Sequence, residues 1–498
     1  MINVLEMLEV SEKKHGEDIA FKDDQNAISY HDFMQLSKRI GSFLARDNYR
    51  NRAVAVLVPK SVMMLTCFMG VIYSGNFYVP IDAEMPVDRM KIIFDTVLPK
   101  KIIVNKDTCG LDLQQYNQDK ILYEDLIREV ANAELLKKIR RAAIDTDPVY
   151  ALFTSGSTGI PKGVIVCHRS VIDYAKWCTK TFGFNHNTVF GNQTPFYFSM
   201  SVLDIYSTIA SGGCLVIIPK MYFSFPADLI EYLNQHKVNT LYWVPSALCI
   251  VAKSNILSMM NLEYIEKVLF AGEVMPTKQL NTWRKYLPDA LYANLFGPTE
   301  ITDIGIYYIL DRSFEDDEVI PIGTPCENVD AFILDSNDKL IVQPGEVGEL
   351  YFRGSYLAHG YYRNLEKTDE VFVQNPLNKE YPEIVYKTGD LVKWNEKGEM
   401  IYVSRKDFQI KHMGCRIELG EIENCANAIP QIDRSAIVFD KRNDEIVMYF
   451  EGKGNENDIR AFMKNKLPKY MMPNKILKMR QLPLNENGKI DKKKLQEE

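Results

Sequence analysis

The stretch that decides the fold is Leu152-Phe153-Thr154-Ser155-Gly156-Ser157-Thr158-Gly159-Ile160-Pro161-Lys162-Gly163-Val164. It combines three glycines, four hydroxyl side chains and one lysine. The glycines let the backbone come close to a ligand, because no side chain stands in the way. The hydroxyl groups and the exposed N–H groups of such a loop donate hydrogen bonds, and Lys162 adds a positive charge. This combination predicts a loop that holds phosphate oxygens.

The loop differs from the Walker phosphate loop of nucleotide-binding proteins. That motif has Gly directly before its Lys, whereas this chain has Pro161 before Lys162. Apolar runs at 149–153 and 164–166 predict a strand on each side of the loop, where a Walker loop leads from a strand into a helix. The alternative is a plain flexible turn between two strands, which would not need the lysine.

The composition is that of an ordinary globular protein. The 498 residues are 46% hydrophobic and 25% charged, and this length predicts two or more domains. A net charge of −7 argues against general binding to nucleic acid. The nine cysteines are scattered without a C-x-x-C pair, which predicts free thiols in a cytoplasmic protein. The apolar run at 62–73 is shorter than the ~20 residues that span a membrane, so it predicts a buried helix.

Strand-like and helix-like runs alternate through most of the chain, which predicts an α/β fold. Strands are predicted at 53–58, 101–104, 214–218, 240–244, 267–271 and 291–295, and helices at 61–73, 226–236 and 276–286. Short apolar strands with helices between them predict a large N-terminal domain of mixed, mostly parallel sheets. After about residue 330 the runs at 331–334, 349–353 and 400–403 are separated by turns, which predicts a small barrel-like part.

The last part of the chain is predicted to form a separate small domain. Strands at 434–439 and 445–451 and an amphipathic helix at 458–467 predict a small C-terminal α+β domain. The polar stretch at 404–407 marks its start. We therefore predict a large domain at 1–404 and a small, mobile domain at 405–498.

Four further stretches place polar residues at predicted turns. They are Asn294-Leu295-Phe296-Gly297-Pro298-Thr299-Glu300, Tyr386-Lys387-Thr388-Gly389-Asp390-Leu391, Arg405 to Glu423, and Leu482 to Asp491. Each has an ordinary alternative: a solvated Glu300, a Gly-Asp turn before a strand, a charged surface hairpin followed by a helix, and a solvated Lys489. Beside a phosphate loop, however, Glu300 becomes a candidate Mg²⁺ ligand, since Mg²⁺ binds carboxylates together with substrate phosphates.

Taken together, the five stretches resemble the adenylate-forming (ANL) superfamily in their order and spacing, over about residues 20–495. The run 416–423 and the ending Asn487-Gly488-Lys489-Ile490-Asp491 look most like stand-alone adenylation domains of nonribosomal peptide synthesis, such as D-alanine–carrier protein ligases. The resemblance implies a ligase that uses ATP and Mg²⁺. A carboxylate attacks the α-phosphate of ATP, giving acyl-AMP and pyrophosphate. A phosphopantetheine thiol of a carrier protein then takes the acyl group as a thioester.

The resemblance also implies roles for individual residues. Lys489 would be the catalytic lysine and Glu300 the Mg²⁺ ligand. Asp407 would be the hinge between the domains, and Gly414 would lie where the pantetheine arm passes. The residues expected to contact the nucleotide are Thr154 (also expected to be catalytic), Ser155, Gly156, Ser157, Thr158, Gly159, Lys162, Asn294, Phe296, Gly297, Thr299, Asp390 and Arg405. Lys489 is expected to act at the carboxyl group of the substrate in the first half-reaction, and the thiol must reach the same carbon in the second. The small domain is therefore expected to swing between two arrangements.

One departure from the family pattern concerns the substrate. Ser199 stands where the α-amino-acid branch has an Asp that pairs with the α-ammonium group of the substrate. Loss of one partner of a buried ion pair costs about 3–5 kcal/mol, or roughly 10² to 10³ in affinity. The substrate pocket is expected to contain Phe198, Ser199, Met200, Leu203, Leu269, Ala271, Leu295, Asp303, Ile304 and Lys489.

Three substrate classes stay open. The amine of the substrate can lie further from its carboxylate, as in β-alanine, and pair with Asp303. The substrate can instead be a hydroxybenzoic or hydroxy acid whose hydroxyl contacts Asp303. In the third case Asp303 points away, Ser199 holds a small α-amino acid through water, and the enzyme is a D-alanine–carrier protein ligase.

Other functions remain as alternatives. An acyl-CoA synthetase shares the first half-reaction, and a catalytically silent binding protein would lack both. Intact Lys162, Glu300, Asp390 and Lys489 argue against the silent protein. No carrier-attachment or condensation motif is found, so we expect a cytoplasmic enzyme with a separate carrier protein and no nucleic-acid or membrane partner.

Overall fold

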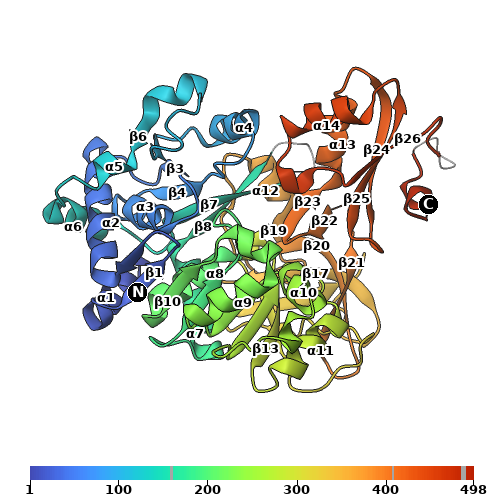
Figure 1. Cartoon of the computed structure of the whole chain (residues 1–498), viewed down its shortest axis with the longest axis horizontal. Helices are drawn as coiled ribbons and strands as arrows, with labels where there is room; N and C mark the ends of the chain where they lie inside the picture. The colour runs from blue at the N-terminus through green and yellow to red at the C-terminus, as the bar shows by residue number, and fades with distance from the viewer. Residues whose placement is uncertain (157–160, 407–408, 484–489, 498) are drawn as a thin grey trace.

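The computed structural model describes residues 1–156, 161–406, 409–483 and 490–497. Two large sheets and a smaller one build the N-terminal part, which ends at residue 406. The C-terminal part, 409–483 and 490–497, lies against one side of it (Figure 1).

The first large sheet carries the phosphate loop. Its strands in spatial order are β18 (Gly360–Tyr361), β8 (Lys162–Cys167), β7 (Pro148–Thr154), β4 (Phe77–Pro80), β3 (Ala53–Leu57), β5 (Lys101–Val104) and β6 (Lys120–Leu122). The five strands from β7 to β6 run parallel. Strands β7 and β8 are antiparallel, so the loop leads from strand to strand as predicted.

The second large sheet has nine strands and a parallel centre. In spatial order they are β15 (Thr324–Pro325), β14 (Ile306–Ile309), β13 (Leu291–Phe296), β12 (Lys267–Ala271), β11 (Thr240–Trp243), β9 (Val189–Asn192), β10 (Cys214–Ile217), β1 (Ile19–Lys22) and β2 (Ala27–Ser29). The strands from β13 to β1 are parallel. Their carboxyl ends therefore meet at one edge, where ligands of such sheets bind.

The third sheet is the predicted barrel-like part. It contains β16 (Val329–Leu334), β17 (Val347–Gly354), β20 (Ile384–Trp394), β19 (Phe372–Gln374) and β21 (Met400–Arg405), all antiparallel. The prediction of a turn before Asp390 was wrong, because Asp390 lies inside β20. Gly389 has a φ of +74°, and the register with β17 shifts nearby, so the glycine bends a continuous strand instead of ending it.

Helices surround the sheets. They are α1 (Leu5–His15), α2 (Tyr30–Leu44), α3 (Val62–Tyr73), α4 (Val87–Val97), α5 (Tyr123–Leu126), α6 (Ala133–Ala142), α7 (His168–Phe182), α8 (Ser201–Ser211), α9 (Pro226–Gln235), α10 (Pro245–Lys253), α11 (Thr277–Tyr286), α12 (Leu365–Val371), α13 (Leu419–Asn427), α14 (Glu456–Lys464) and α15 (Lys492–Glu497). Helix α3 is the buried apolar helix predicted from the sequence. In the part of the chain that the structure describes, no helix is long and apolar enough to cross a membrane. All nine cysteines are free thiols, as predicted.

The C-terminal part has two small sheets. A hairpin of β22 (Gln409–His412) and β23 (Cys415–Glu418) comes first, followed by a three-stranded sheet of β24 (Ile432–Asp440), β25 (Glu445–Gly452) and β26 (Lys475–Lys478). Alternate residues of β24 and β25 belong to different apolar clusters, so both faces of this sheet are covered. One face packs against α13 and α14, and the other against Leu482 and Leu495.

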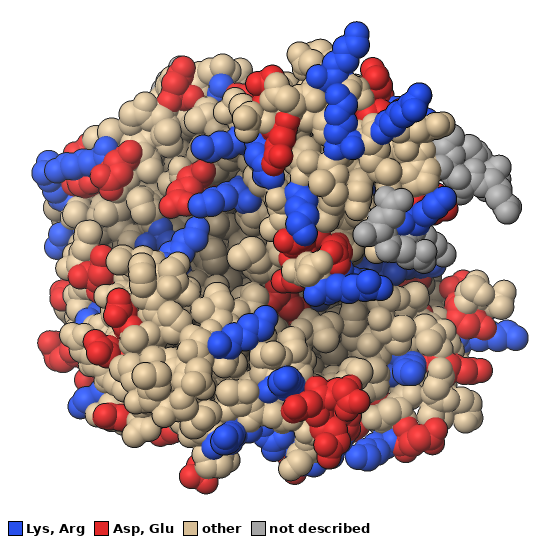
Figure 2. Space-filling model, turned by 45° about the vertical axis from the view of Figure 1, so that its right-hand side comes forward, with Lys and Arg blue, Asp and Glu red and all other residues tan. Residues whose placement is uncertain are grey.

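The surface is mixed in charge. Figure 2 shows one face on which Lys and Arg side chains are interspersed with Asp and Glu, instead of one continuous basic patch. The mixed charges of this face agree with the net charge of −7.

Candidate active site

A cavity of about 70 Å³ lies where the phosphate loop, the carboxyl ends of β12 and β13, and the hairpin β22–β23 meet. The predicted site residues that line it are Thr154, Ser155, Phe198, Ser199, Met200, Ala271, Gly297, Thr299, Asp303, Ile304, Asp390 and Arg405. These residues come from all three sheets of the N-terminal part and from the loops between them. The structure thus brings the predicted phosphate, ribose and substrate residues together around one space.

Other predicted residues do not line the cavity. Leu203, Leu269 and Leu295 are buried in the main apolar core. Gly156, Lys162, Asn294, Phe296 and Glu300 also lie outside the cavity wall. The predictions for Ser157, Thr158, Gly159, Asp407 and Lys489 fall outside the described residues. Roles for all of these residues stay predictions.

Two hydroxyl groups of the phosphate loop face this cavity. The Ser155 hydroxyl donates to the backbone carbonyl of Arg416 at 2.7 Å. The Thr154 hydroxyl is buried and has no hydrogen-bond partner among the described residues. Buried hydroxyl groups in native proteins are normally paired. An unpaired one at a cavity wall fits a position that a ligand oxygen fills.

Asp303 is the buried acid of the substrate end. Its side-chain oxygen Oδ2 accepts from the Tyr174 hydroxyl at 2.7 Å and from the Tyr242 hydroxyl at 3.1 Å. Burial raises the pKa of Asp303 to about 7, although the hydroxyls of Tyr174, Tyr242 and Ser199 act to lower it. Thr299 donates to the Ser199 hydroxyl at 3.2 Å. A weakly acidic carboxyl group therefore stands beside Ser199, within a network of hydroxyl groups.

The backbone before Asp303 is strained. Thr302 has φ +74° and ψ −59°, and the Asp303 N–H donates to the Ile301 carbonyl at 2.9 Å. This is the rare γ-turn with positive φ, which is costly for a β-branched residue. The Thr302 hydroxyl donates to the Tyr356 carbonyl at 2.9 Å and helps to hold the turn. The turn directs Asp303 into the cavity.

Glu300 is fully buried and forms an ion pair with a residue of the C-terminal part. Its two oxygens accept from Nη1 of Arg416 at 2.9 and 2.7 Å, and the Tyr361 hydroxyl donates to Oε1 at 2.7 Å. Burial opposes the charged form, but Arg416, Lys162 and Tyr361 outweigh it and lower the pKa of Glu300 to about 2. Glu300 is therefore a charged carboxylate that Arg416 neutralises in this arrangement.

The nucleotide end carries a second buried ion pair. Nη1 of Arg405 lies 3.0 Å from Oδ1 of Asp390, and both side chains are nearly inaccessible. The Lys411 ammonium group lies 4.5 Å from the ring centre of Phe296. Charged groups from β20, β21 and β22 thus gather at the place where the resemblance puts ribose and base.

The tip of the hairpin β22–β23 closes the cavity. Met413 and Gly414 both have positive φ, as a two-residue hairpin turn requires. The Gly414 N–H donates to Glu273 at 2.9 Å, and the same carboxylate accepts from the Ser246 N–H at 2.8 Å. A β-carbon at Gly414 would lie 2.3 Å from Cγ1 of Val244. This close approach is possible because residue 414 is glycine.

The family model that describes AMP-binding enzymes matches residues 8–362. The chain belongs to the AMP-binding enzyme family. Bacitracin synthase 3 of Bacillus licheniformis is 32% identical over 490 residues, which cover 95% of this chain but only 7% of that protein. Zwittermicin A synthase ZmaJ of Bacillus cereus is 28% identical over 493 residues, covering 95% of this chain and 90% of ZmaJ. The dimodular nonribosomal peptide synthase of Bacillus subtilis (strain 168) is 29% identical over 507 residues, covering 99% of this chain and 21% of that protein.

Solved structures share the fold. Holo-PA1221, an NRPS protein containing adenylation and PCP domains bound to a vinylsulfonamide inhibitor, matches with a TM-score of 0.86 at 21% identity, over 99% of this chain and 84% of that one. The expected two-domain adenylation fold is confirmed. The protein is thus an AMP-binding enzyme with this fold.

Several residues of this AMP-binding enzyme's site were missed in the sequence. Tyr174 and Tyr242 lie in α7 and β11, far from Asp303 in the chain, and nothing in their spacing connects them to it. Tyr470 of the C-terminal part also lines the cavity and packs its ring on Phe198, with the ring centres 5.9 Å apart. Arg416 stood in a motif that was recognised, but its contact with Glu300 depends on how the two parts pack.

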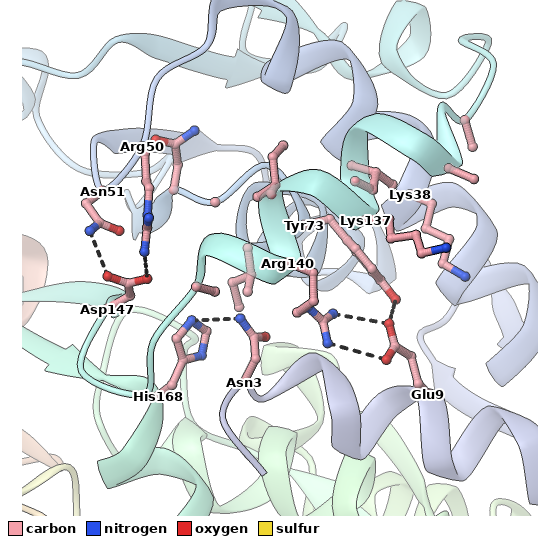
Figure 3. Close-up of a pocket in the computed structure, with 18 of the residues that line it drawn as sticks. Asn3, Glu9, Lys38, Arg50, Asn51, Tyr73, Lys137, Arg140, Asp147 and His168 are labelled. Carbon is pink, nitrogen blue, oxygen red and sulfur yellow. Dashed lines mark hydrogen bonds and ion pairs between the residues drawn. The ribbon is translucent and has the colours of Figure 1, made fainter.

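A larger cavity of about 510 Å³ lies elsewhere in this AMP-binding enzyme, between α1, α2 and α6. No predicted site residue lines it. Figure 3 shows that its carboxylates are already paired within the protein, Glu9 with Arg140 and Asp147 with Arg50. The smaller cavity is therefore the candidate active site.

Proposed function

We propose that the protein joins a small carboxylic acid to AMP and then transfers the acyl group to the phosphopantetheine thiol of a separate carrier protein. The observation that carries this proposal is the single cavity that contains the phosphate-loop hydroxyls of Thr154 and Ser155, the Asp390–Arg405 pair and the Asp303 carboxyl. The loop hydroxyls would contact the triphosphate, the Asp390–Arg405 pair the ribose, and the Asp303 carboxyl a polar group of the acid. A domain boundary at 404/405, with Asp407 as hinge, belongs to the proposal.

ATP and Mg²⁺ are the proposed cofactors. Glu300 would hold Mg²⁺, since a buried carboxylate of low pKa fits an ion that takes one or two protein carboxylates and substrate phosphates. The described residues contain no group of three or more His, Cys, Asp or Glu that could bind a metal alone, so the phosphates would complete the site. Mg²⁺ would neutralise charge on the phosphates. It needs Glu300 free, and therefore needs Arg416 withdrawn.

The arrangement of the C-terminal part suits the second half-reaction. The hairpin β22–β23 places Gly414 at the cavity, and no described residue after Tyr470 lines it. Leu482 and Ile490, which flank the predicted catalytic Lys489, belong to an apolar cluster on the far face of the β24–β25 sheet from α13. Lys489 would serve adenylation in a second arrangement, with the C-terminal part turned.

The pocket favours a substrate whose amine or hydroxyl is not the standard α-amino group. Ser199 carries no charge, whereas the neighbouring Asp303 presents a carboxyl group to the same cavity. A β-amino acid could pair its ammonium group with Asp303, which would lower the pKa of this carboxyl. A hydroxybenzoic or hydroxy acid could instead donate its hydroxyl to Asp303.

Pyrophosphate release tests the proposal. The panel comprises D- and L-alanine, β-alanine, hydroxybenzoates and short hydroxy acids, on wild type, Ser199→Asp and Asp303→Asn. We expect wild type to prefer an acid without an α-amine, and Ser199→Asp to gain α-amino acids. A wild type that prefers D-alanine would refute the substrate class. The acceptor is tested with a phosphopantetheinylated carrier against free CoA, and faster transfer to CoA would make the protein an acyl-CoA synthetase.

A further inference from the structure

We infer that Arg89 and Glu421 form a latch that holds the C-terminal part in the arrangement described above. The latch rests on the proposed function, because it concerns the step after adenylation. Arg89 lies in α4 of the N-terminal part and Glu421 in α13 of the C-terminal part. The guanidinium and the carboxylate are in direct contact, with only 5% and 2% of the two side chains exposed.

The position of Arg89 indicates a specific purpose. It lies in the first turn of α4, where the positive end of the helix dipole disfavours a cation. Glu421 lies in the first turn of α13, where the dipole favours an anion. The arginine is thus disfavoured by its own helix, and the contact with Glu421 across the interface compensates for this.

Glu421 also connects the C-terminal part to the phosphate loop. Burial raises the pKa of Glu421, while Arg89 and the backbone N–H of Gly156 lower it. The Ser155 hydroxyl of the same loop donates to the Arg416 carbonyl at 2.7 Å. The C-terminal part therefore offers the Arg416 carbonyl to a hydroxyl group that the proposed function assigns to phosphate oxygens. Pyrophosphate and this arrangement compete for the same loop.

Opening the latch is costly unless both charges reach water together. When one partner of a buried ion pair is removed, the other remains uncompensated, and the equilibrium shifts by roughly 10² to 10³. If Arg89 or Glu421 is neutralised, the C-terminal part should therefore leave this arrangement. The latch would release only after substrates bind, and would close again when pyrophosphate has left.

Hydrogen–deuterium exchange of the full chain without ligand tests the latch. Exchange is measured in the peptides that cover the hairpin, 409–418, and the start of the phosphate loop, 150–156. In Arg89→Met and Glu421→Gln we expect exchange at least tenfold faster there, with β24 and β25 still protected. Lys91→Met in the same helix, which removes an ammonium 3.7 Å from Asp88 at the surface, is the matched control and should change nothing. Unchanged exchange in both latch variants overturns the proposal.

Two rescue variants separate charge pairing from general damage. Arg89→Lys keeps the charge and should keep most of the protection. The exchanged pair Arg89→Glu with Glu421→Arg should restore it. If β24 and β25 stay protected while both rescue variants exchange as fast as Arg89→Met, charge pairing does not hold the parts together and the latch is refuted.

Pyrophosphate itself is the second probe. Added to wild type, it should protect the loop peptide and speed exchange in the hairpin. Protection of the loop with no change in the hairpin would overturn the competition. These measurements need no substrate acid, so they decide the latch even if no acid in the panel releases pyrophosphate, which would refute only the proposed function.

Discussion

Arg416 reaches across the interface between the two parts of the chain and binds Glu300, with Nη1 2.9 and 2.7 Å from the two carboxylate oxygens. Glu300 is fully inaccessible, and Arg416 is 16% exposed at its side chain. The carboxylate proposed for Mg²⁺ thus has a protein cation beside it in this arrangement. One carboxylate can serve both half-reactions if Arg416 and the metal ion alternate at it.

Replacing Arg416 by Met should therefore separate the two half-reactions. We expect transfer to the carrier thiol to slow by roughly 10², because Glu300 stays buried without its charged partner. ATP–pyrophosphate exchange should be nearly unchanged. Arg434→Met, an exposed arginine in β24, is the control. An equal loss in both half-reactions would show that Arg416 acts in adenylation as well.

Gly414→Ala should block the same step for a steric reason. The added β-carbon would lie 2.3 Å from Cγ1 of Val244, so the hairpin tip could not reach the cavity. We expect transfer to fall at least tenfold in single-turnover assays. Gly398→Ala is a matched control, since Gly398 has φ +73° against +74° at Gly414 and no atom within 4 Å of an added β-carbon. Val244→Ala should partly restore Gly414→Ala; if it does not, the clash is not the cause.

Asp303→Asn should change how stability depends on pH. The pKa of Asp303 is raised to about 7 by burial, above its usual value of 3.8, so its stabilising protonated form is lost as pH rises through 7. Between pH 5 and pH 8, wild type should lose about 2.5 kcal/mol of unfolding free energy relative to Asp303→Asn. Urea unfolding at both pH values measures this. Asp369→Asn, an exposed aspartate in α12, should follow wild type, and identical pH slopes for wild type and Asp303→Asn would contradict the raised pKa.

Lys489→Ala tests the residue that the resemblance marks as catalytic. A positioned ammonium group that bridges the acid and the α-phosphate would contribute about 3 kcal/mol, by analogy with a single oxyanion donor. Adenylate formation should fall by more than about 10², while transfer from preformed acyl-AMP stays near wild type. Lys453→Ala, an exposed lysine of the C-terminal part, is the control. Equal losses in both assays would remove Lys489 from the assigned role.

Local sequence patterns predicted much of this fold. The strands at 101–104 and 267–271 were predicted with the bounds that β5 and β12 have, and the phosphate loop joins two strands as expected. Strong apolar runs bounded by turn residues make such predictions possible. Asp390 was misplaced at a turn, because a glycine with positive φ can bend a strand as well as end it.

The partners of the site residues could not be predicted. Tyr174 and Asp303 are 129 residues apart, and Arg416 and Glu300 are 116 residues apart. Each contact depends on how helices and sheets pack, and in the second case on the placement of the C-terminal part. The contact between Arg89 and Glu421 could not be predicted for the same reason, and a charged residue in a helix is usually solvated.

The γ-turn at Thr302 has a consequence for redesign and for evolution. The direction of the side chain at position 303 is set by the backbone before it, which the Thr302 hydroxyl anchors to the Tyr356 carbonyl. Under the proposed function, a substitution at 303 would therefore change the chemical group presented to the acid while the turn that positions residue 303 stays in place. If Asp303 contacts the acid as proposed, single substitutions at position 303 should be enough to change which acid the enzyme prefers.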